Sequence, residues 1–358
     1  MRVALVGLPR SGKSTLLSAI GAVEGSHLHL ERADQEHLAV AKVPEERLAF
    51  LEQAHKAKKR TYAEIEFLDV PGLDLSDESA RERSRTHWPA VRQSDLIALV
   101  VRNFRNNASP PYRDRVNVEA DLDEILAEML FSDLEQVTAR MDKLQGVLKK
   151  PSPPKEREAK QHELALFGRL QAALESEKPL TSAIQHAAEE KIVRSFAFLT
   201  LKPLLIVINC DESALPQEPP ARIRGYDTLC LSAKLELELG QLEPSERADF
   251  MKELGLAALA HDRLVRTCCR TMNLITFLTV GEKEARAWLV PAGTDAVTAA
   301  GDIHTDMARG FIRAEVVSFA DLSAAGSEQA AKAAGKMRLE GRDYVVADGD
   351  VLNVRFGA

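Results

Sequence analysis

The sequence predicts an α/β protein in which a doubly wound, mostly parallel sheet contains an inserted α-helical hairpin and precedes a small α+β domain. Apolar, β-branched runs typical of buried strands alternate with helical patterns from Arg2 to Val101, and resume after Pro203. The stretch between them shows heptad spacing and no strand pattern. From Asn273 onward the sequence changes to short strands separated by turns and short helices.

Length, charge and cysteine content limit the possible classes of protein. A chain of 358 residues is long enough for two or three domains with a sizeable core. Its net charge of −7 means that any contact with nucleic acid depends on a local basic patch. The four cysteines form no C-x-x-C pair, which favours reduced thiols and argues against zinc. The longest apolar run is too short for a membrane span and no targeting segment precedes the first strand, so we expect a soluble, cytoplasmic protein.

A phosphate-binding pattern separates the first strand from the first helix. Gly7-x-x-x-x-Gly12-Lys13-Ser14 fits G-x-x-x-x-G-K-[ST], and the strand before it and the helix after it argue against a chance glycine turn. Such a loop closes backbone N–H groups around phosphate oxygens, and the helix N-terminus adds positive potential. We expect Lys13 to reach the β- and γ-phosphates and the Ser14 hydroxyl to ligate Mg²⁺. The predicted triphosphate-binding residues are Gly7, Arg10, Ser11, Gly12, Lys13, Ser14 and Thr15.

A second motif, Asp69-Val-Pro-Gly72, follows the predicted strand Ala63–Asp69. It places a carboxylate at the C-terminal end of a strand, where ligands bind in doubly wound sheets. We expect Asp69 to hold the Mg²⁺ shell through water and the Gly72 N–H to sense the γ-phosphate. Alone, Asp-x-Pro-Gly is also a common turn. Combined with the phosphate loop, it predicts a catalytic centre of Lys13, Asp69 and Gly72, with Ser14 and Asp69 as the metal-binding residues.

The residue after this motif, Leu73, bears on turnover. Many GTPases have a glutamine there that orients the attacking water. A leucine side chain has no hydrogen-bonding group, so we expect slow hydrolysis unless another group or a partner orients the water.

The strand that ends near Ile208 is followed by Asn209-Cys210-Asp-Glu212, at the position of a base-reading motif. GTPases have N-K-x-D there, and the aspartate accepts two hydrogen bonds from guanine. Glu212 is one methylene longer, and Cys210 replaces the lysine whose stem packs on the base. A further strand leads into Ser232-Ala233-Lys234, a loop that usually closes over the base. The predicted residues at the base end of the site are Asn209, Cys210, Glu212, Ser232 and Ala233.

The segment between the two strand-rich regions predicts two helices. Apolar residues at heptad spacing mark the first, and a proline-rich turn, residues 149–154, separates it from a second periodic stretch that ends at Pro179. The two helices form an antiparallel hairpin, and the apolar seam pairs them. Its charged tip is a candidate for contact with a polyanion, through Lys149, Lys150, Lys155 and Arg157.

The C-terminal region combines short strands in hairpins with a crossing helix, which is compatible with a ubiquitin-like (β-grasp) roll. Scattered basic residues make contact with RNA a hypothesis based on charge. We expect residues 1–108 and 200–272 to form the nucleotide-binding domain, residues 109–199 the helical insertion, and residues 273–358 the C-terminal domain.

Several motifs together resemble the YchF subfamily of Obg-like ATPases, P-loop proteins related to translation factors. The resemblance rests on the phosphate loop, the Asp69 motif and Asn209-x-x-Glu212, together with Val43–Leu48 and Val100–Phe104. It is densest near the C-terminus, in the runs Lys283–Trp288, Ala300–Asp306, Gly310–Val316, Ala334–Arg338 and Asp348–Asp350. It covers most of the chain and is weakest in the insertion.

The resemblance implies a P-loop nucleotide-binding domain interrupted by a helical arm and followed by a TGS domain. It also implies a preference for ATP over GTP through the N-x-x-E variant, with Cys210 against adenine. The implied partners are the ribosome and its RNA, reached through the TGS domain and the arm; no contact with DNA is expected.

The chain departs from the family pattern at several places, one of which is a glycine-rich segment after D-x-x-G that is shortened here to the charged stretch Leu73–Gln93. Arg10 and Ser11 stand where the family loop has Asn and Val. The switch-loop threonine that normally ligates Mg²⁺ aligns with Ala33, between Arg32 and Asp34, none of which has a hydroxyl. Three functions therefore stay open: a slow ATPase that associates with ribosomes, a GTPase of the same superfamily, and a turnover-deficient nucleotide-binding scaffold.

Overall fold

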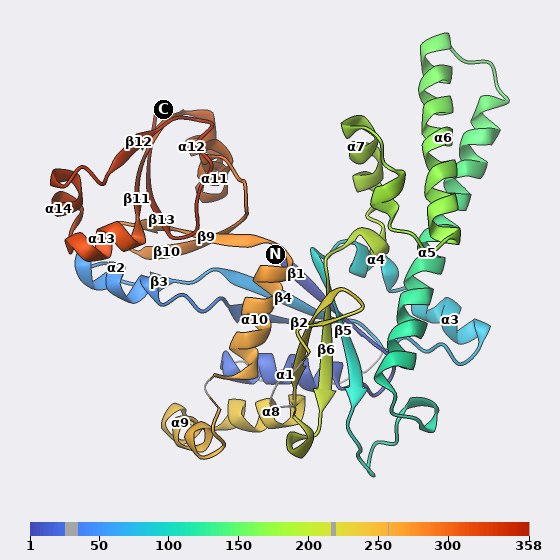
Figure 1. The fold of residues 1–358 in the computed structure, drawn as a ribbon, viewed down its shortest axis with the longest axis horizontal. Helices are drawn as coiled ribbons and strands as arrows, with labels where there is room; N and C mark the ends of the chain where they lie inside the picture. Colours follow the sequence, from blue (N-terminus) through green and yellow to red (C-terminus); the bar gives the residue numbers. More distant parts are fainter. Residues whose placement is uncertain (26–34, 216–219, 257, 358) are drawn as a thin grey trace. The chain divides into compact units, whose positions relative to one another are not determined.

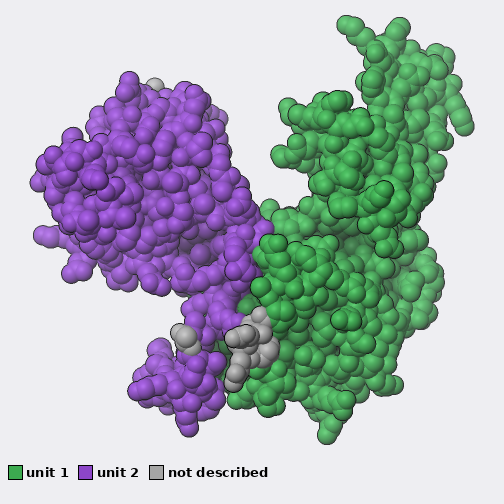
Figure 2. Space-filling view, in the orientation of Figure 1, with its two compact units in different colours: residues 1–39, 67–242 green, residues 40–66, 243–358 purple. Residues whose placement is uncertain are grey.

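The computed structural model describes residues 1–25, 35–215, 220–256 and 258–357. The chain divides into two compact units (Figure 2): unit 1 consists of residues 1–39 and 67–242, and unit 2 of residues 40–66 and 243–358. Residues 40–66 and 243–272, which the sequence analysis assigns to the first domain, thus group with the C-terminal strands. The division into three domains stays a prediction.

The first sheet has seven strands in the order β2-β4-β1-β5-β6-β8-β7. Strand β5 pairs in parallel with β1 and β6, β6 pairs in parallel with β8, and β7 pairs antiparallel with β8. Neighbouring strands are mostly not consecutive in the chain, so helical crossovers connect them. This confirms the predicted doubly wound sheet. Its strands are β1 (Arg2–Val6), β2 (His37–Lys42), β4 (Glu64–Asp69), β5 (Leu96–Asn103), β6 (Leu204–Cys210), β7 (Arg222–Ile223) and β8 (Tyr226–Leu231).

Helices cover both faces of the central strands, and this explains why those strands are continuous apolar runs. Every residue of β6 is buried, and β5 is buried up to its last residue. Helix α1 (Lys13–Val23) packs against α8 (Ala233–Gln241), where a Cβ atom at Gly240 would lie 2.9 Å from the Ala22 Cβ. On the other face, Trp88, Ile125 and Met129 join the strand side chains in one core cluster.

The charged stretch between Ser76 and Arg92 does not form one continuous helix. It forms two short helices, α3 (Glu78–Arg85) and α4 (Trp88–Arg92). The Asp77 side chain accepts a hydrogen bond from the Ala80 N–H and begins α3. Proline in the first turn of α4 has no N–H to continue the earlier helix. Helix α4 is packed against the core in spite of the charged sequence around it, because Trp88 and Val91 are buried.

The predicted helical hairpin is confirmed. Helix α5 (Val118–Leu148) and helix α6 (Pro154–Glu175) are antiparallel and joined by a short proline-containing turn (Figure 1). The base of α5 packs on the sheet, whereas its distal half packs against α6. Helix α7 (Ala187–Phe196) and the 3-10 turns Leu180–Ala183 and Leu199–Leu201 complete this second core. The buried side chains of the hairpin seam include Val137, Leu166, Phe167, Leu170 and Leu174.

Unit 2 contains a six-stranded mixed sheet in the order β12-β11-β13-β9-β10-β3. Strands β9 and β10 form an antiparallel pair, as do β11 and β13, while β13 and β9 are parallel. The α+β architecture is confirmed, whereas the assignment to the TGS type stays a prediction. The strands are β3 (Arg60–Thr61), β9 (Leu274–Val280), β10 (Ala285–Pro291), β11 (Phe311–Ser318), β12 (Arg338–Glu340) and β13 (Asp350–Phe356).

Two core clusters lie on the two faces of this sheet. Helix α11 (Ala296–Ile303) covers one face with Ala296, Ala299 and Ala300, close to α12 (Thr305–Arg309). The other face is covered by α2 (Arg47–His55), α13 (Phe319–Ala325) and α14 (Glu328–Ala333). Helices α9 (Pro244–Glu253) and α10 (Ala260–Thr271) precede the first of its C-terminal strands. Across the described ranges, none of the helices has the length and apolar character needed to span a bilayer.

Candidate nucleotide-binding site

A cavity of about 1160 Å³ opens at the C-terminal ends of β1, β5, β6 and β8. Each of these parallel strands contributes the loop that follows it, which is the usual place for ligands in this sheet topology. The volume exceeds that of most small-molecule sites and suffices for a nucleoside triphosphate. The lining residues form four segments: 10–15, 104–109, 209–213 and 232–238.

The phosphate loop requires glycine at position 12 for two reasons. Gly12 has a φ of +93°, a conformation that side chains disfavour, and it begins helix α1 as its N-cap. A Cβ atom there would also lie 2.1 Å from the Asn209 Nδ2. The loop is therefore closely packed against the loop that follows β6. It directs the N-terminus of α1 into the cavity, as anion binding requires.

Lys13 lies buried in this loop, and its amine donates hydrogen bonds to the carbonyls of Gly7 (3.1 Å) and Leu8 (3.3 Å). Burial lowers the pKa of the Lys13 amine to about 8, against the opposing effect of the nearby Asp69 carboxylate. Lys13 therefore lies in the phosphate loop and lines the cavity, as the sequence predicts; we call this side of the cavity the phosphate end.

Ser14 and Asp69 lie together, although 55 positions separate them in the sequence. The Ser14 hydroxyl donates a 2.6 Å hydrogen bond to Asp69 Oδ2, while the buried Oδ1 has no hydrogen-bond partner among the described residues. Burial raises the pKa of the Asp69 carboxyl, and Lys13 and the Ser14 hydrogen bond oppose that rise. A hydroxyl and an unsatisfied carboxylate oxygen are the hard donors that Mg²⁺ prefers. The pair therefore fits the predicted cation.

The rest of the metal shell must come from other groups. No cluster of three or more His, Cys, Asp or Glu side chains suited to a metal occurs among the described residues. Mg²⁺ usually keeps several waters and binds through one or two protein groups plus substrate phosphates. The switch-loop positions Arg32, Ala33 and Asp34 lie outside the described residues.

Gly72 and Leu73 are packed against the phosphate loop. A Cβ atom at Gly72 would lie 2.8 Å from Pro9 Cα, and the Leu73 N–H donates a 3.0 Å hydrogen bond to the Gly7 carbonyl. The Leu73 side chain is buried in the core cluster of the sheet and does not line the cavity. The position that bears a glutamine in many GTPases therefore directs its side chain into the core of the sheet in this chain.

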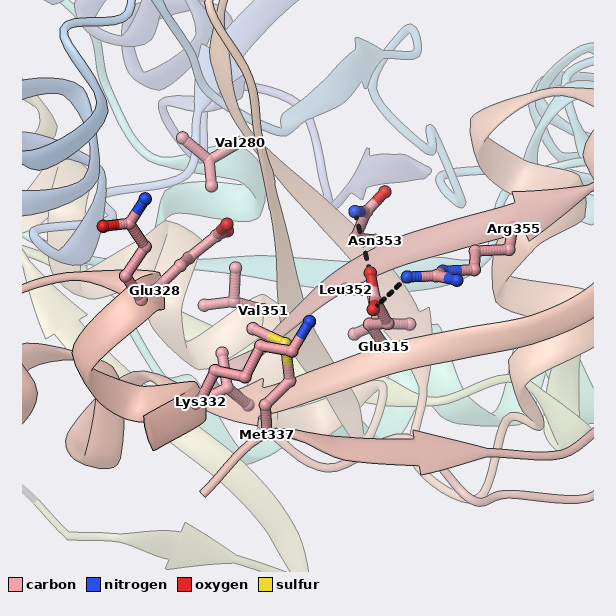
Figure 3. Close-up of a pocket in the computed structure, with 11 residues that line it drawn as sticks. Val280, Glu315, Glu328, Lys332, Met337, Val351, Leu352, Asn353 and Arg355 are labelled. Carbon is pink, nitrogen blue, oxygen red and sulfur yellow. Dashed lines mark hydrogen bonds and ion pairs between the residues drawn. The ribbon is translucent and has the colours of Figure 1, made fainter. Parts of the chain in front are cut away.

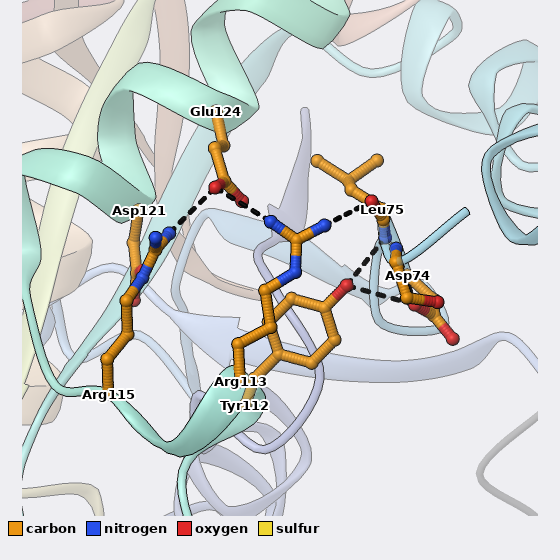
Figure 4. A network of polar contacts seen from close by, with 8 residues as sticks. Asp74, Leu75, Tyr112, Arg113, Arg115, Asp121 and Glu124 are labelled. Carbon is orange, nitrogen blue, oxygen red and sulfur yellow. Dashed lines mark hydrogen bonds and ion pairs between the residues drawn. The ribbon is translucent and has the colours of Figure 1, made fainter. Parts of the chain in front are cut away.

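A polar network fixes the segment after Leu73 (Figure 4). The Tyr112 hydroxyl donates to Asp74 Oδ1 at 3.0 Å and accepts from the Leu75 N–H at 2.9 Å. Arg113 donates to the Leu75 carbonyl and, at 2.8 Å, to Glu124 on α5. Two further ion pairs, from Arg115 to Glu124 and Asp121, extend the network along α5. The chain that follows the Asp69 motif is thus tied to the base of the helical hairpin, which no sequence motif predicts.

At the base end, Asn209 connects two loops of the site. Its Nδ2 donates to the Ser11 carbonyl, and its Oδ1 accepts from the Ala233 N–H, both at 3.0 Å. The Ser232 hydroxyl accepts a hydrogen bond from the Leu235 N–H and caps α8. Asn209, Ser232 and Ala233 are therefore brought together with the phosphate loop, and both ends of the Asn209 amide are occupied by protein groups.

Cys210 and Glu212 both line the cavity. The Cys210 thiol ends strand β6 in a buried position and accepts a 3.7 Å hydrogen bond from Asn103 Nδ2. Asp211 accepts a hydrogen bond from the Arg105 N–H, which holds the loop after β5 against the loop after β6. Glu212 begins an exposed 3-10 turn, Glu212–Ala214. The base end thus contains one buried sulfur and one exposed carboxylate.

Arg102 is a structural residue of the site that sequence reasoning missed. It is buried, and its guanidinium donates to the carbonyls of Arg10 (3.0 Å), Phe104 (3.1 Å) and Ser109 (2.7 Å). It also lies 4.1 Å from the centre of the Phe104 ring. Burial lowers the pKa of the Arg102 guanidinium. Arg102 therefore fixes the phosphate loop to the wall formed by residues 104–109, and only its place in the resembling run Val100–Phe104 could have indicated it.

Unit 2 contains a separate cavity of about 240 Å³ between β11, β13 and α14 (Figure 3). Glu315 accepts hydrogen bonds from Asn353 and Arg355 at one side, and Val280, Val317 and Val351 provide apolar walls. The residues that line this cavity include no phosphate loop, and the helix that begins at it, α14, has only 6 residues. The larger cavity of unit 1 is therefore the candidate site for a triphosphate.

Two family models match parts of the chain. One, described as "50S ribosome-binding GTPase", matches residues 2–138. The other, YchF-GTPase_C, described as "Protein of unknown function (DUF933)", matches residues 274–357.

Similar proteins match almost the whole chain. The chain is 35% identical over 364 residues to "Ribosome-binding ATPase YchF" of Bacillus subtilis (strain 168), covering 98% of each. It is 34% identical over 361 residues to the protein of the same name from Escherichia coli O157:H7, again covering 98% of each. The solved structure of the Schizosaccharomyces pombe YchF GTPase superposes with a TM-score of 0.82 and 28% identity, over 99% of this chain and 97% of that one. Because such relatives match it over nearly its full length, the chain belongs to the YchF family.

Proposed function

We propose that this protein is a slow, Mg²⁺-dependent ATPase that works in association with the ribosome. The observation that supports it most directly is the contact between Ser14 and Asp69 beside the buried Lys13. This arrangement offers a cation, a hydroxyl and a carboxylate at the phosphate end of one cavity. It suits transfer of a terminal phosphoryl group to water, in which positioning and charge stabilisation supply most of the catalysis.

In this proposal each group of the loop has one task. The N-terminus of α1 and the Lys13 amine bind the β- and γ-phosphates, which replace the Gly7 and Leu8 carbonyls as partners of the amine. Ser14 and Asp69 hold Mg²⁺, the hydroxyl directly and the carboxylate through water. The bound Mg²⁺ neutralises charge that develops on the phosphate oxygens. Gly72 provides a backbone N–H close to Pro9, near the γ-phosphate end of the loop.

Slow turnover follows from the position of Leu73. Its side chain is buried and has no group that can orient the attacking water. Without such a group the attacking water is not held in place, and its ordering adds to the activation free energy of hydrolysis. A ribosomal partner that orders the water, or a residue it supplies, would raise the rate.

The residues at the base end of the cavity support tighter binding of ATP than of GTP. Guanine recognition needs a carboxylate in fixed bidentate geometry, and Glu212 lies on an exposed turn with one methylene more than aspartate. Cys210 offers a soft, weakly polar surface against adenine. A GTPase of the same superfamily is the alternative, with Glu212 still reading guanine.

The proposal that the ribosome is the partner rests on the names of the relatives. The two bacterial relatives described above are named ribosome-binding ATPases, and they match this chain along nearly its full length. We propose contact with ribosomal RNA through the C-terminal domain, as a TGS domain, and through the charged tip of the hairpin. A ribosomal partner places the activity in the cytoplasm. The division into a nucleotide-binding domain, the hairpin and the C-terminal domain is part of this proposal.

Titration of the full chain with ATP and GTP, each with and without Mg²⁺, tests the proposal. We expect tighter binding of ATP, a requirement for Mg²⁺ and phosphate release that increases with added ribosomes. Clearly tighter binding of GTP would contradict the choice of substrate. Binding without phosphate release, even with ribosomes, would favour the turnover-deficient scaffold, for which the burial of Leu73 is the supporting observation.

A further inference from the structure

The chain that follows Gly72 leads from the phosphate loop to the base of the helical hairpin. The Leu73 N–H donates a 3.0 Å hydrogen bond to the Gly7 carbonyl, and a Cβ atom at Gly72 would lie 2.8 Å from Pro9 Cα. Residues 74–75 instead contact helix α3 and the turn that precedes α5. The position of the Gly72 N–H is therefore determined by contacts on both sides of it along the chain.

Tyr112 and Arg113, in the turn before α5, hold the second of these contacts (Figure 4). The Tyr112 hydroxyl donates to Asp74 Oδ1 at 3.0 Å and accepts from the Leu75 N–H at 2.9 Å. Arg113 donates to the Leu75 carbonyl. Burial and the hydrogen bond to Asp74 raise the pKa of Tyr112, so its hydroxyl stays protonated and donates at neutral pH.

Ser84 on α3 binds the backbone of the neighbouring residue. Its hydroxyl accepts from the Asp74 N–H at 2.9 Å and donates to the Asp74 carbonyl at 3.2 Å. All four backbone polar groups of residues 74–75 are thus bound by side chains, because Tyr112 and Arg113 bind the other two. Residues 74–75 belong to no helix or strand. These three side chains therefore determine where the segment lies.

Arg113 has a backbone conformation that most residues avoid. Its φ is +52° and that of Asp114 is +53°, both in the left-handed region. Aspartate tolerates this region because its short side chain can form local hydrogen bonds, whereas a turn there seldom contains arginine. Such an outlier persists where the surrounding contacts determine it. Here those contacts are the hydrogen bonds of Arg113 to Leu75 and Glu124.

Helix α5 fixes the turn and α3 through a row of acidic side chains on one face. Glu124 accepts hydrogen bonds from Arg113 and Arg115, both at 2.8 Å. Arg85, next to Ser84 on α3, donates to the helix at 2.7 and 3.2 Å. The acceptors follow helical spacing, so they lie on the same side of α5. They are Asp121, Glu124, Glu128 and Glu135.

We propose that Tyr112 and Arg113 are positioning residues for phosphate release: they hold the chain after Gly72 and, through Glu124, make the placement of the Gly72 N–H depend on helix α5. Neither side chain lines the large cavity, so both act through Gly72. A displaced donor at the γ-phosphate lowers the rate without loosening the rest of the nucleotide. The effect on phosphate release rests on the proposed function, whereas the connection between residues 74–75 and α5 does not.

Tyr112→Phe tests the effect on the reaction, because it keeps the ring and removes only the hydroxyl. In single-turnover phosphate release with ATP and Mg²⁺ we expect the rate constant to fall about tenfold, since a small misplacement is costly to the chemical step. The Kd of a fluorescent ATP analogue should change less than about twofold, because Lys13, Ser14 and Asn209 are intact. Tyr226→Phe, at an exposed tyrosine of β8, is the matched control and should change neither quantity.

A purely structural role of Tyr112 gives a different result. Tyr112→Phe would then unfold at a lower urea concentration, while the rate constant of the folded protein stayed at the natural value, and this outcome would overturn the proposal. Arg113→Lys provides a second, conservative variant. Lysine offers one nitrogen where the guanidinium uses two, so it cannot reach both Leu75 and Glu124, and its rate should be lower than that of the natural protein.

Hydrogen exchange of the full-length protein without nucleotide tests the connection to α5. In Glu124→Gln, peptides that contain residues 73–76 should exchange about tenfold faster, because the turn that protects the Leu75 amide is released. Glu158→Gln, at an exposed position of α6, is the matched control and should leave this exchange unchanged. Unchanged exchange of residues 73–76 in Glu124→Gln would overturn the proposal. A natural protein that releases no phosphate contradicts the proposed function instead, and the exchange measurement then decides the connection by itself.

Discussion

The two ends of the nucleotide cavity differ in how firmly the protein fixes them. At the phosphate end, Gly12 and Gly72 are packed so closely that a Cβ atom would clash with neighbouring atoms, and Lys13, Ser14 and Asp69 are all engaged in hydrogen bonds. At the base end, Glu212 lies on an exposed turn and Cys210 contributes a thiol. The phosphate end defines the chemistry, whereas the base end leaves the choice of base to weaker contacts.

Asn209 joins the two ends. Its amide hydrogen-bonds to Ser11 on one side and to Ala233 on the other, so both ends of the cavity depend on this one side chain. We therefore expect that substitutions at the phosphate end abolish phosphate release and that those at Asn209 lower both stability and nucleotide affinity. Substitutions at the base end should change only the choice of base or the reactivity of the thiol.

The largest effect is expected for Lys13→Ala. Removal of the only side-chain cation buried in the phosphate loop should lower phosphate release by about 100-fold or more, through lost charge stabilisation. Measurement of ATP binding and turnover checks this. Lys143→Ala, on the exposed face of α5, removes the same charge elsewhere and should leave turnover unchanged. Equal turnover in the two variants would place the catalytic end somewhere else.

The next largest effect is expected for Asn209→Ala. It leaves the buried Ser11 carbonyl and Ala233 N–H without their partner, at a cost of about 1–3 kcal/mol for each in the free energy of unfolding. Urea denaturation measures the loss, and nucleotide titration should show weaker binding.

Asn209→Asp is the matched control for that variant. Aspartate still accepts from the Ala233 N–H but cannot donate to the Ser11 carbonyl, so its stability should fall between those of Asn209→Ala and the natural protein. A stability equal to that of the natural protein would mean that the bond to Ser11 contributes nothing.

Leu73→Gln tests whether the buried position explains slow turnover. Because the leucine lies in the core cluster, a glutamine there buries an amide without a partner and should cost about 1–3 kcal/mol in the free energy of unfolding. We expect no gain in phosphate release, since the new side chain does not face the cavity. Faster release without loss of stability would show that residue 73 reaches the nucleotide.

The smallest effect concerns the pH dependence of Cys210 alkylation. The groups that face the thiol are Cys230, Asn103 and Asp211. Cys230 and Asn103 lower its pKa from 9.0 to about 7, whereas burial and the Asp211 carboxylate act in the opposite direction. Thiolate increases as pH rises, so iodoacetamide should react about tenfold faster at pH 8 than at pH 6 and then level off. For a thiol with the ordinary pKa, the rate of alkylation would instead increase by roughly 90-fold over the same interval and would continue to rise above pH 8.

The sequence predicted the features that depend on local patterns. The phosphate loop, the Asp69 motif, the hairpin and the α+β C-terminal region all have spacings that a single stretch of chain reveals, and the fold confirms the elements. The residues named for the site stay predictions for nucleotide binding, although the structure brings Ser14 to Asp69 and Asn209 to the phosphate loop.

The features that the sequence did not predict depend on contacts between distant segments. Arg102 acts on the Arg10 carbonyl, 92 positions away, and Tyr112 acts on Asp74 and Leu75. Neither residue has a spacing that distinguishes it from an ordinary arginine or tyrosine. Strands β3 and β12 have only two and three residues, too few for an alternating pattern. They form because longer strands offer an edge with free backbone groups.

The composition of unit 2 has a consequence for how this kind of protein can change in evolution. Its core combines Leu48 and Leu51, from the first fifth of the chain, with Leu278, Val317 and Val351. Arg47 is also paired with Asp348, 301 positions later. The C-terminal region matched by a family model, residues 274–357, is therefore not a detachable cassette. A recombination event that exchanged it alone would leave an apolar helix face uncovered, so the two stretches must be inherited, and altered, together.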